Sequence, residues 1–216
     1  MGAITRSIAN NITTSGVFTS SAITNNSVTN ITSIPNEPAD GITLISSQTA
    51  SASATISFTS GITSTYKAYK FVFSNIHPAT NGSEFQFNLS TDSGSNYNVT
   101  KTSTHFIAQH GEDDTTAFTY STGGDLAQST GFQSMSTSTK NDNDSALSGS
   151  LQLFNPSSTV YVKHYISNIN TMHQDSKSKN AFVAGYGNTT SAVNAIQFKF
   201  NSGNIDAGTI YLYGIK

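Results

Sequence analysis

The five histidines of this 216-residue chain are the side chains best suited to acid–base chemistry or metal binding. No two of them are spaced as ligands of one metal ion. His105 and His110 are five residues apart, which on a strand points their side chains to opposite faces. The motifs G-x-S-x-G, H-E-x-x-H and G-K-[ST] do not occur. We therefore expect packed or surface histidines, no catalytic residue, no metal or other cofactor, and no enzyme activity. The histidines are His77, His105, His110, His164 and His173.

Two short acidic segments contain the oxygen ligands that Ca²⁺ prefers. Glu112-Asp113-Asp114 follows a glycine, and Asp142-Asn143-Asp144 lies within the polar stretch 140–145. The second segment begins like an EF-hand loop but lacks the central glycine and the terminal glutamate of that motif. We expect solvated loops at 112–114 and 142–144, and the sequence leaves calcium binding there open.

Three tyrosines have neighbours typical of sugar-binding sites. Tyr97 lies between two asparagines, Tyr186 lies between two glycines, and Tyr120 comes shortly before a Gly-Gly pair. Aromatic rings pack against the C–H faces of sugars, while amides and hydroxyls bond to the sugar hydroxyls. We expect Tyr97, Tyr120 and Tyr186 to lie in candidate ligand-binding loops. Ordinary packing at strand ends is the alternative.

Small polar residues set the composition of the chain. Ser, Thr and Asn make up 85 of the 216 residues, charged residues are 10%, and the formal net charge is -2. There is no basic excess to neutralise phosphates, so we expect no nucleic-acid binding. No apolar run is long enough for membrane insertion. The 13 Phe and 9 Tyr, with so little net charge, argue against disorder and favour a folded β protein.

The chain has no cysteine, which excludes disulfides and thiolate sites. Its first residues, Met1–Arg6, are not followed by the long apolar stretch of a signal peptide. We therefore expect synthesis and folding in a cytosol.

Alternating apolar and polar residues predict about eight to ten short strands after Gly41, separated by turn residues. No segment keeps an apolar stripe of helical period for three turns. Residues 42–216 are therefore predicted to form an all-β, antiparallel β-sandwich, most plausibly a jelly roll. The predicted strands are Thr55–Thr59, Tyr69–His77, Glu84–Ser90, Leu147–Phe154, Thr159–Ile166, Val193–Phe200 and Gly208–Ile215, with weaker runs at Asn96–Ile107, Ala117–Tyr120 and Ala181–Tyr186.

Residues 1–41 have a different pattern, in which the larger apolar residues recur every five or six positions. This spacing fits neither a helix nor a long strand, but suits short turns that each offer one apolar side chain to a shared axis. One copy buries too little to offset its backbone entropy, so several copies are needed. We predict an extended attachment and trimerisation leader that ends in a Pro-rich linker, with a flexible tail as the alternative. Its assembly residues are Ile8, Ile12, Val17, Phe18, Ile23, Val28, Ile31 and Ile34.

Three segments of the chain resemble recurrent segments of marine bacteriophage virion proteins, similar to tail-fibre or appendage proteins of phages that infect cyanobacteria and other ocean bacteria. The segments are Asp125–Phe132 (DLAQSTGF), Leu153–His164 (LFNPSSTVYVKH) and Ser202–Ile215 (SGNIDAGTIYLYGI). The N-terminal part resembles the leader that attaches such domains to a particle. The resemblance covers most of the chain and implies a β-sandwich module in a homotrimeric virion component. Because its motifs are structural, it carries over no active-site residue.

The expected function is therefore that of a bacteriophage virion structural protein, as a trimeric tail fibre or appendage that displays a β-sandwich for host attachment. Its expected partners are further copies of itself, other virion proteins through the leader, and host surface glycan through distal loops. A capsid decoration, cement or capsid-fibre protein is one alternative. A carbohydrate-binding module or glycan-active enzyme is another.

Overall fold

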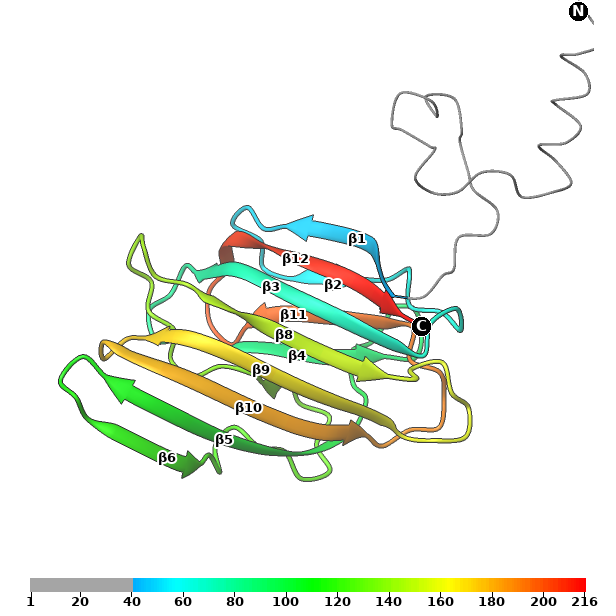
Figure 1. Cartoon of the computed structure of the whole chain (residues 1–216). Coiled ribbons are helices and arrows are strands. Elements are labelled where there is room, and N and C mark those ends of the chain that lie inside the picture. Colours follow the sequence, from blue (N-terminus) through cyan, green and yellow to red (C-terminus); the bar gives the residue numbers. More distant parts are fainter. Residues whose placement is uncertain (1–40) are drawn as a thin grey trace, which may run out of the picture. The chain divides into compact units, whose positions relative to one another are not determined.

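The computed structural model of the chain describes residues 41–216, so the predicted assembly residues Ile8 to Ile34 lie outside the described residues. The described residues form two antiparallel sheets that pack face to face (Figure 1). This arrangement confirms the predicted all-β antiparallel sandwich, while the jelly-roll topology remains a prediction. Among these residues, no helix is long and apolar enough to cross a membrane.

The large sheet has eight strands and the small sheet has four. Across the large sheet the order is β1 (Ile42–Thr49), β12 (Ile205–Ile215), β3 (Ala68–Pro78), β8 (Leu147–Phe154), β9 (Lys163–His173), β10 (Lys177–Gly187), β5 (Lys101–Gly111) and β6 (Thr116–Tyr120). Across the small sheet it is β2 (Ile56–Phe58), β11 (Ala195–Phe200), β4 (Phe85–Ser90) and β7 (Gln133–Ser134).

All ten predicted strands overlap observed ones, but β1 and β7 were not predicted. A bulge between Leu44 and Ser46 interrupts the alternation of apolar and polar residues in β1. This strand is therefore not recognised from its alternation. β9 begins at Lys163, four residues later than expected, because a loop replaces its predicted start. The hydroxyl of Ser158 accepts the N–H groups of Val160 and Tyr161, and such local bonds compete with strand pairing.

Aromatic rings join the two sheets across one half of the interior. Phe198 of the small sheet is fully buried. Its ring lies 5.3 Å from that of Phe71 and 5.2 Å from that of Phe73, both on β3 of the large sheet. Within the small sheet it stacks on Phe85 at 5.8 Å. Such tilted, edge-to-face and stacked ring pairs add to the hydrophobic burial that holds the layers together.

The other half of the interior mixes buried polar side chains with apolar ones such as Ile169 and Val183, and it is covered mainly by the segment 121–146, which contains β7. Buried side chains from β5 and β9 face this segment, among them His105, Ser167 and Thr171. Neither ring nitrogen of His105 has a hydrogen-bond partner within residues 41–216. Burial lowers the pKa of His105, although the negative charges of Glu84 and Asp125 partly oppose this shift, so burial favours the neutral ring.

The two ends of the sandwich differ. At the entry end the chain enters at Ile42, which lies opposite Ile215 near the C-terminus (Figure 1). At the far end lie the turns 112–115 and 174–176, the segment 140–146 and the start of β12. This far end carries seven of the twelve carboxylates of the chain, which are Glu112, Asp113, Asp114, Asp142, Asp144, Asp175 and Asp206.

The contact between Gly124 and His105 allows a matched test of the loop cover. A Cβ atom on Gly124 would lie 1.9 Å from Nδ1 of His105, whereas a Cβ on Gly123 would meet nothing within 4 Å. We expect Gly124→Ala to lower the free energy of unfolding by about 1–3 kcal/mol, because the ring is enclosed and cannot move aside freely. Gly123→Ala is the control and is expected to change it by less than about 0.5 kcal/mol. Equal effects of the two variants in urea denaturation would contradict the close packing.

Candidate functional site

A groove of about 670 Å³ lies at the far end of the sandwich. Its floor consists of short polar side chains from four adjacent strands, namely Asn75 of β3, Ser148 of β8, Asn170 of β9 and Ser178 of β10. Asn170 donates from Nδ2 to the hydroxyl of Ser178 at 2.9 Å, and the Ser148 hydroxyl accepts the N–H of Asn75 at 3.1 Å. The floor therefore presents amides and hydroxyls at positions fixed by the strands.

Carboxylates from both acidic segments line the same groove. Glu112 and Asp114 come from the β5–β6 turn, and Asp144 comes from the loop before β8. A second hollow of about 490 Å³ adjoins the groove and shares Asn75 and Asp144 with it. Lys177 is the lysine that lines the groove. Hence two segments about 30 residues apart in sequence contribute acceptors to one surface.

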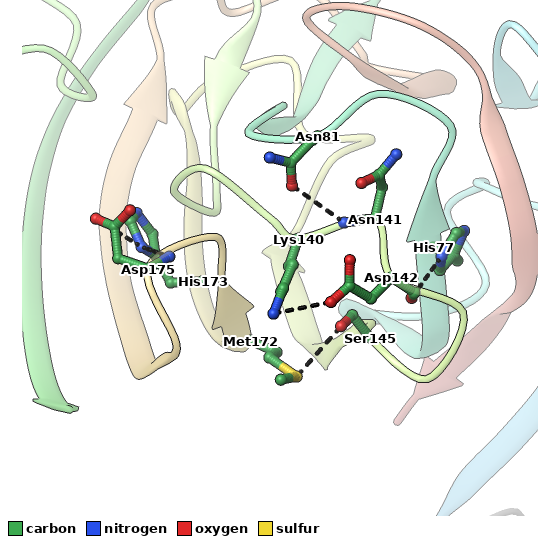
Figure 2. Close-up of polar contacts among 9 residues, drawn as sticks. All are labelled: His77, Asn81, Lys140, Asn141, Asp142, Ser145, Met172, His173 and Asp175. Carbon is green, nitrogen blue, oxygen red and sulfur yellow. Dashed lines mark hydrogen bonds and ion pairs between the residues drawn. The ribbon is translucent and has the colours of Figure 1, made fainter. Parts of the chain in front are cut away.

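The remaining carboxylates of these segments are held by their neighbours. Asp113 accepts the hydroxyl of Thr115 at 2.6 Å, and the hydrogen bonds from Thr115 lower the pKa of Asp113. Figure 2 shows the other segment, in which Nζ of Lys140 lies 2.8 Å from Oδ2 of Asp142. This hydrogen bond raises the pKa of Lys140. Asp113 and Asp142 therefore shape their loops, and Glu112, Asp114 and Asp144 are the ones presented to the groove.

Three histidines at the far end each lie beside an aspartate. His110 and Asp114 approach to 3.1 Å, and His77 lies 3.7 Å from Asp206. In Figure 2 the buried His173 lies beside Asp175, whose N–H donates to Nδ1 of the ring at 3.1 Å. Burial lowers the pKa of His173, which keeps this ring neutral and Nδ1 available as an acceptor. The three pairs are the His77–Asp206, His110–Asp114 and His173–Asp175 pairs.

Within residues 41–216, no three histidine or carboxylate side chains gather closely enough to hold one metal ion. The arrangement instead suits a neutral or weakly cationic ligand rich in hydroxyl groups. Carboxylate and amide oxygens accept hydrogen bonds from such a ligand, while amide and ammonium groups donate to it.

The three candidate tyrosines do not come together. Tyr97 is half-buried in the loop 91–100, where its backbone carbonyl accepts a hydrogen bond from Nδ2 of Asn88 at 2.6 Å. Tyr120 ends β6 and donates its hydroxyl to Asp125 at 2.8 Å, which raises the pKa of Tyr120. Tyr186 lies on β10, with its ring 6.2 Å from that of His164. They therefore mark three separate places on the domain.

An aromatic group on the outer face of the large sheet was not predicted. Phe106 lies opposite Tyr120 in the β5–β6 pair and stacks on Phe182 of β10 at 5.1 Å. The ring of Phe118 lies 5.4 Å from that of Phe106, and Phe118 is 71% exposed. The sequence does contain a signal for this group, because β5 and β10 have apolar residues at consecutive positions and hence on both faces.

Beneath the Tyr97 loop lies a fully buried lysine, Lys101. Its Nζ donates to Oδ1 of Asn88 and, at 2.8 Å, to the carbonyl oxygen of Val99. Both acceptors are neutral, so these hydrogen bonds only partly offset the loss of hydration and no carboxylate balances the charge. Burial accordingly lowers the pKa of Lys101 from 10.5 to about 7. Asn88 connects Lys101 to the Tyr97 loop.

No protein-family model, curated protein or solved structure matches this chain. The class that the structure defines is thus the antiparallel β-sandwich, with a polar groove at the far end.

The buried lysine predicts a pH dependence of stability. Unfolding returns Lys101 to its ordinary pKa, so the unfolded chain binds one more proton than the folded chain between about pH 7 and 10. The free energy of unfolding is therefore expected to rise with pH in this window, by up to about 1.4 kcal/mol per pH unit. Urea denaturation between about pH 7.5 and 9.5 measures this slope.

Lys101→Met is expected to remove most of that slope, because methionine cannot titrate. Burial also lowers the pKa of Lys163 and Lys179, which leaves a smaller slope of the same sign. Lys67→Met replaces an exposed lysine and is expected to leave the slope unchanged. An unchanged slope in Lys101→Met would contradict the assignment.

Proposed function

We propose that the chain is a structural protein of a bacteriophage virion, a trimeric tail fibre or appendage that displays its sandwich for host attachment. The observation that carries the proposal is the position of the groove. The chain enters at Ile42 and ends near Ile215 at one end, and the groove lies at the other. A leader attached through the entry end leaves the groove free to meet a ligand.

The chemistry of the groove favours a host surface glycan as that ligand. Its floor offers amides and hydroxyls from Asn75, Ser148, Asn170 and Ser178, and its rim offers carboxylates. Sugar hydroxyls both donate and accept, so this mixture matches them. None of the three candidate tyrosines lines this groove, so the groove is a further candidate place for the sugar contacts.

Labelling of phage particles tests the virion assignment. An antibody against the purified full chain, applied to particles from the source and viewed by electron microscopy, is expected to mark the tail or its appendages. Label on the capsid shell would instead favour the decoration or capsid-fibre alternative. Absence of label on intact and gently disrupted particles would contradict a virion protein.

Glycan binding tests the groove separately. The full chain is expected to bind one class of host glycan on an array, with affinity that depends on the groove floor. Asn170→Ala removes an amide from the floor and is expected to weaken binding about three- to tenfold, the usual effect of one lost hydrogen bond. Asn168→Ala is the matched control, because Asn168 is exposed on the same strand, β9, but does not line the groove.

Equal binding by the two variants would contradict the groove as the glycan site. Release of free sugar from a bound glycan would favour the glycan-active enzyme.

A further inference from the structure

The two outer strands of the large sheet leave their outer backbone edges open. β1 pairs with β12, and β6 pairs with β5, and within residues 41–216 neither has a strand on its other side. An open edge presents a row of N–H and C=O groups that can pair with another strand. The sheet therefore has two places at which a further strand can be added.

The two edges run in opposite directions. Each of the eight strands is antiparallel to its neighbours, so the first and the last, β1 and β6, are antiparallel to each other. If copies of the chain are related by rotation about an axis along the strands, β6 of one copy runs antiparallel to β1 of the next. The pairing within the sheet would then continue between copies without a change of type.

Both edges lack charged side chains and proline, two of the features that usually prevent such pairing. Neither β1 (ITLISSQT) nor β6 (TAFTY) contains a charged residue, a proline or a glycine. Natural sheets commonly protect their edges with lysine, proline or bulges. The bulge of β1 follows Leu44, so Ile42–Leu44 stays regular and can pair with the last three residues of β6.

Each edge also exposes two large apolar side chains on the same face of the sheet. On β1, Ile42 is 62% exposed and Leu44 is 54% exposed. On β6, Phe118 is 71% exposed and Tyr120 is 53% exposed. Leu44 lies opposite Tyr213 and Tyr120 lies opposite Phe106, on the face away from the buried Leu212 and Ile107.

We propose that β6 of one copy pairs antiparallel with β1 of a second copy, so that the large sheets join edge to edge in a closed ring. The contact would bring Phe118 and Tyr120 beside Ile42 and Leu44 as cross-strand neighbours, which shields apolar surface on both partners. Such a contact joins two different surfaces, so it uses both edges of every copy when the ring closes. The number of copies, three, rests on the proposed function, whereas the pairing of edges does not.

Cysteine cross-linking of the full chain tests the proposal, because the natural chain contains no cysteine. We place one cysteine on each edge, as Thr43→Cys on β1 and Thr119→Cys on β6. Residues opposite each other in neighbouring strands have Cα and Cβ distances that a disulfide or a short bismaleimide can span. The double variant is expected to give a ladder of cross-linked species that ends at the ring size.

The single variants distinguish pairing of β6 with β1 from pairing of two identical edges. Each alone is expected to give no cross-linking above that of Ser202→Cys, a control on the exposed turn before β12. An equimolar mixture of the two is expected to give dimers and nothing larger, since each linked pair has one cysteine from each edge. Adding Phe118→Asp to the double variant is expected to reduce the yield at least about tenfold, because a carboxylate would be placed in the apolar contact.

Two results would overturn the edge pairing. One is a double variant that cross-links no better than the control, and the other is dimer formation by Thr119→Cys alone, which would place two β6 strands against each other. Light scattering distinguishes a failure of the edge pairing from a failure of the proposed trimeric appendage. A trimer without cross-links leaves the trimeric appendage standing and removes the edge contact, whereas a cross-linked ring of another size keeps the contact and removes the trimer.

Discussion

The structure depends on covering an eight-stranded sheet with a sheet of only four strands. Phe198 and its aromatic neighbours join the layers where they overlap, with ring separations of 5.2 to 5.8 Å to Phe71, Phe73 and Phe85. β9 still meets the small sheet where Tyr165 packs on Phe87 at 5.0 Å, and beyond it the inner faces of β10 and β5 are covered largely by irregular chain. Buried backbone and side-chain polar groups then need partners other than a facing strand.

The segment 121–146 provides this cover, and the interior beneath it is correspondingly polar. Leu126 and Ser103 bond through their backbones, and Gln133 accepts the hydroxyl of the buried Tyr165 at 3.2 Å. The same segment continues into the far-end loop that carries Lys140, Asp142 and Asp144. The cover of this interior and part of the rim of the groove thus belong to one continuous segment. A substitution that shifts the cover is therefore expected to shift the position of Asp144 at the groove as well.

The two ends and the two edges of the sandwich separate the proposed roles. The groove lies at the far end, the chain enters at the other end, and the uncharged edges β1 and β6 lie along the sides. Joining copies through the edges would use none of the residues that line the groove. Several identical grooves facing the same way would strengthen attachment to a surface that carries repeated glycans, since linked weak sites bind more tightly together than alone.

The sequence by itself determined the all-β class and ten of the strands, because alternation of residues such as Phe85, Phe87 and Leu89 is a local property of a half-buried strand. It also identified both acidic segments. Only the tertiary structure decided that Glu112 and Asp144 share a groove, that Tyr97, Tyr120 and Tyr186 lie apart, and that β1 is an exposed edge. These facts depend on strand order and pairing, which bring together residues distant in the chain and leave no periodic trace in it.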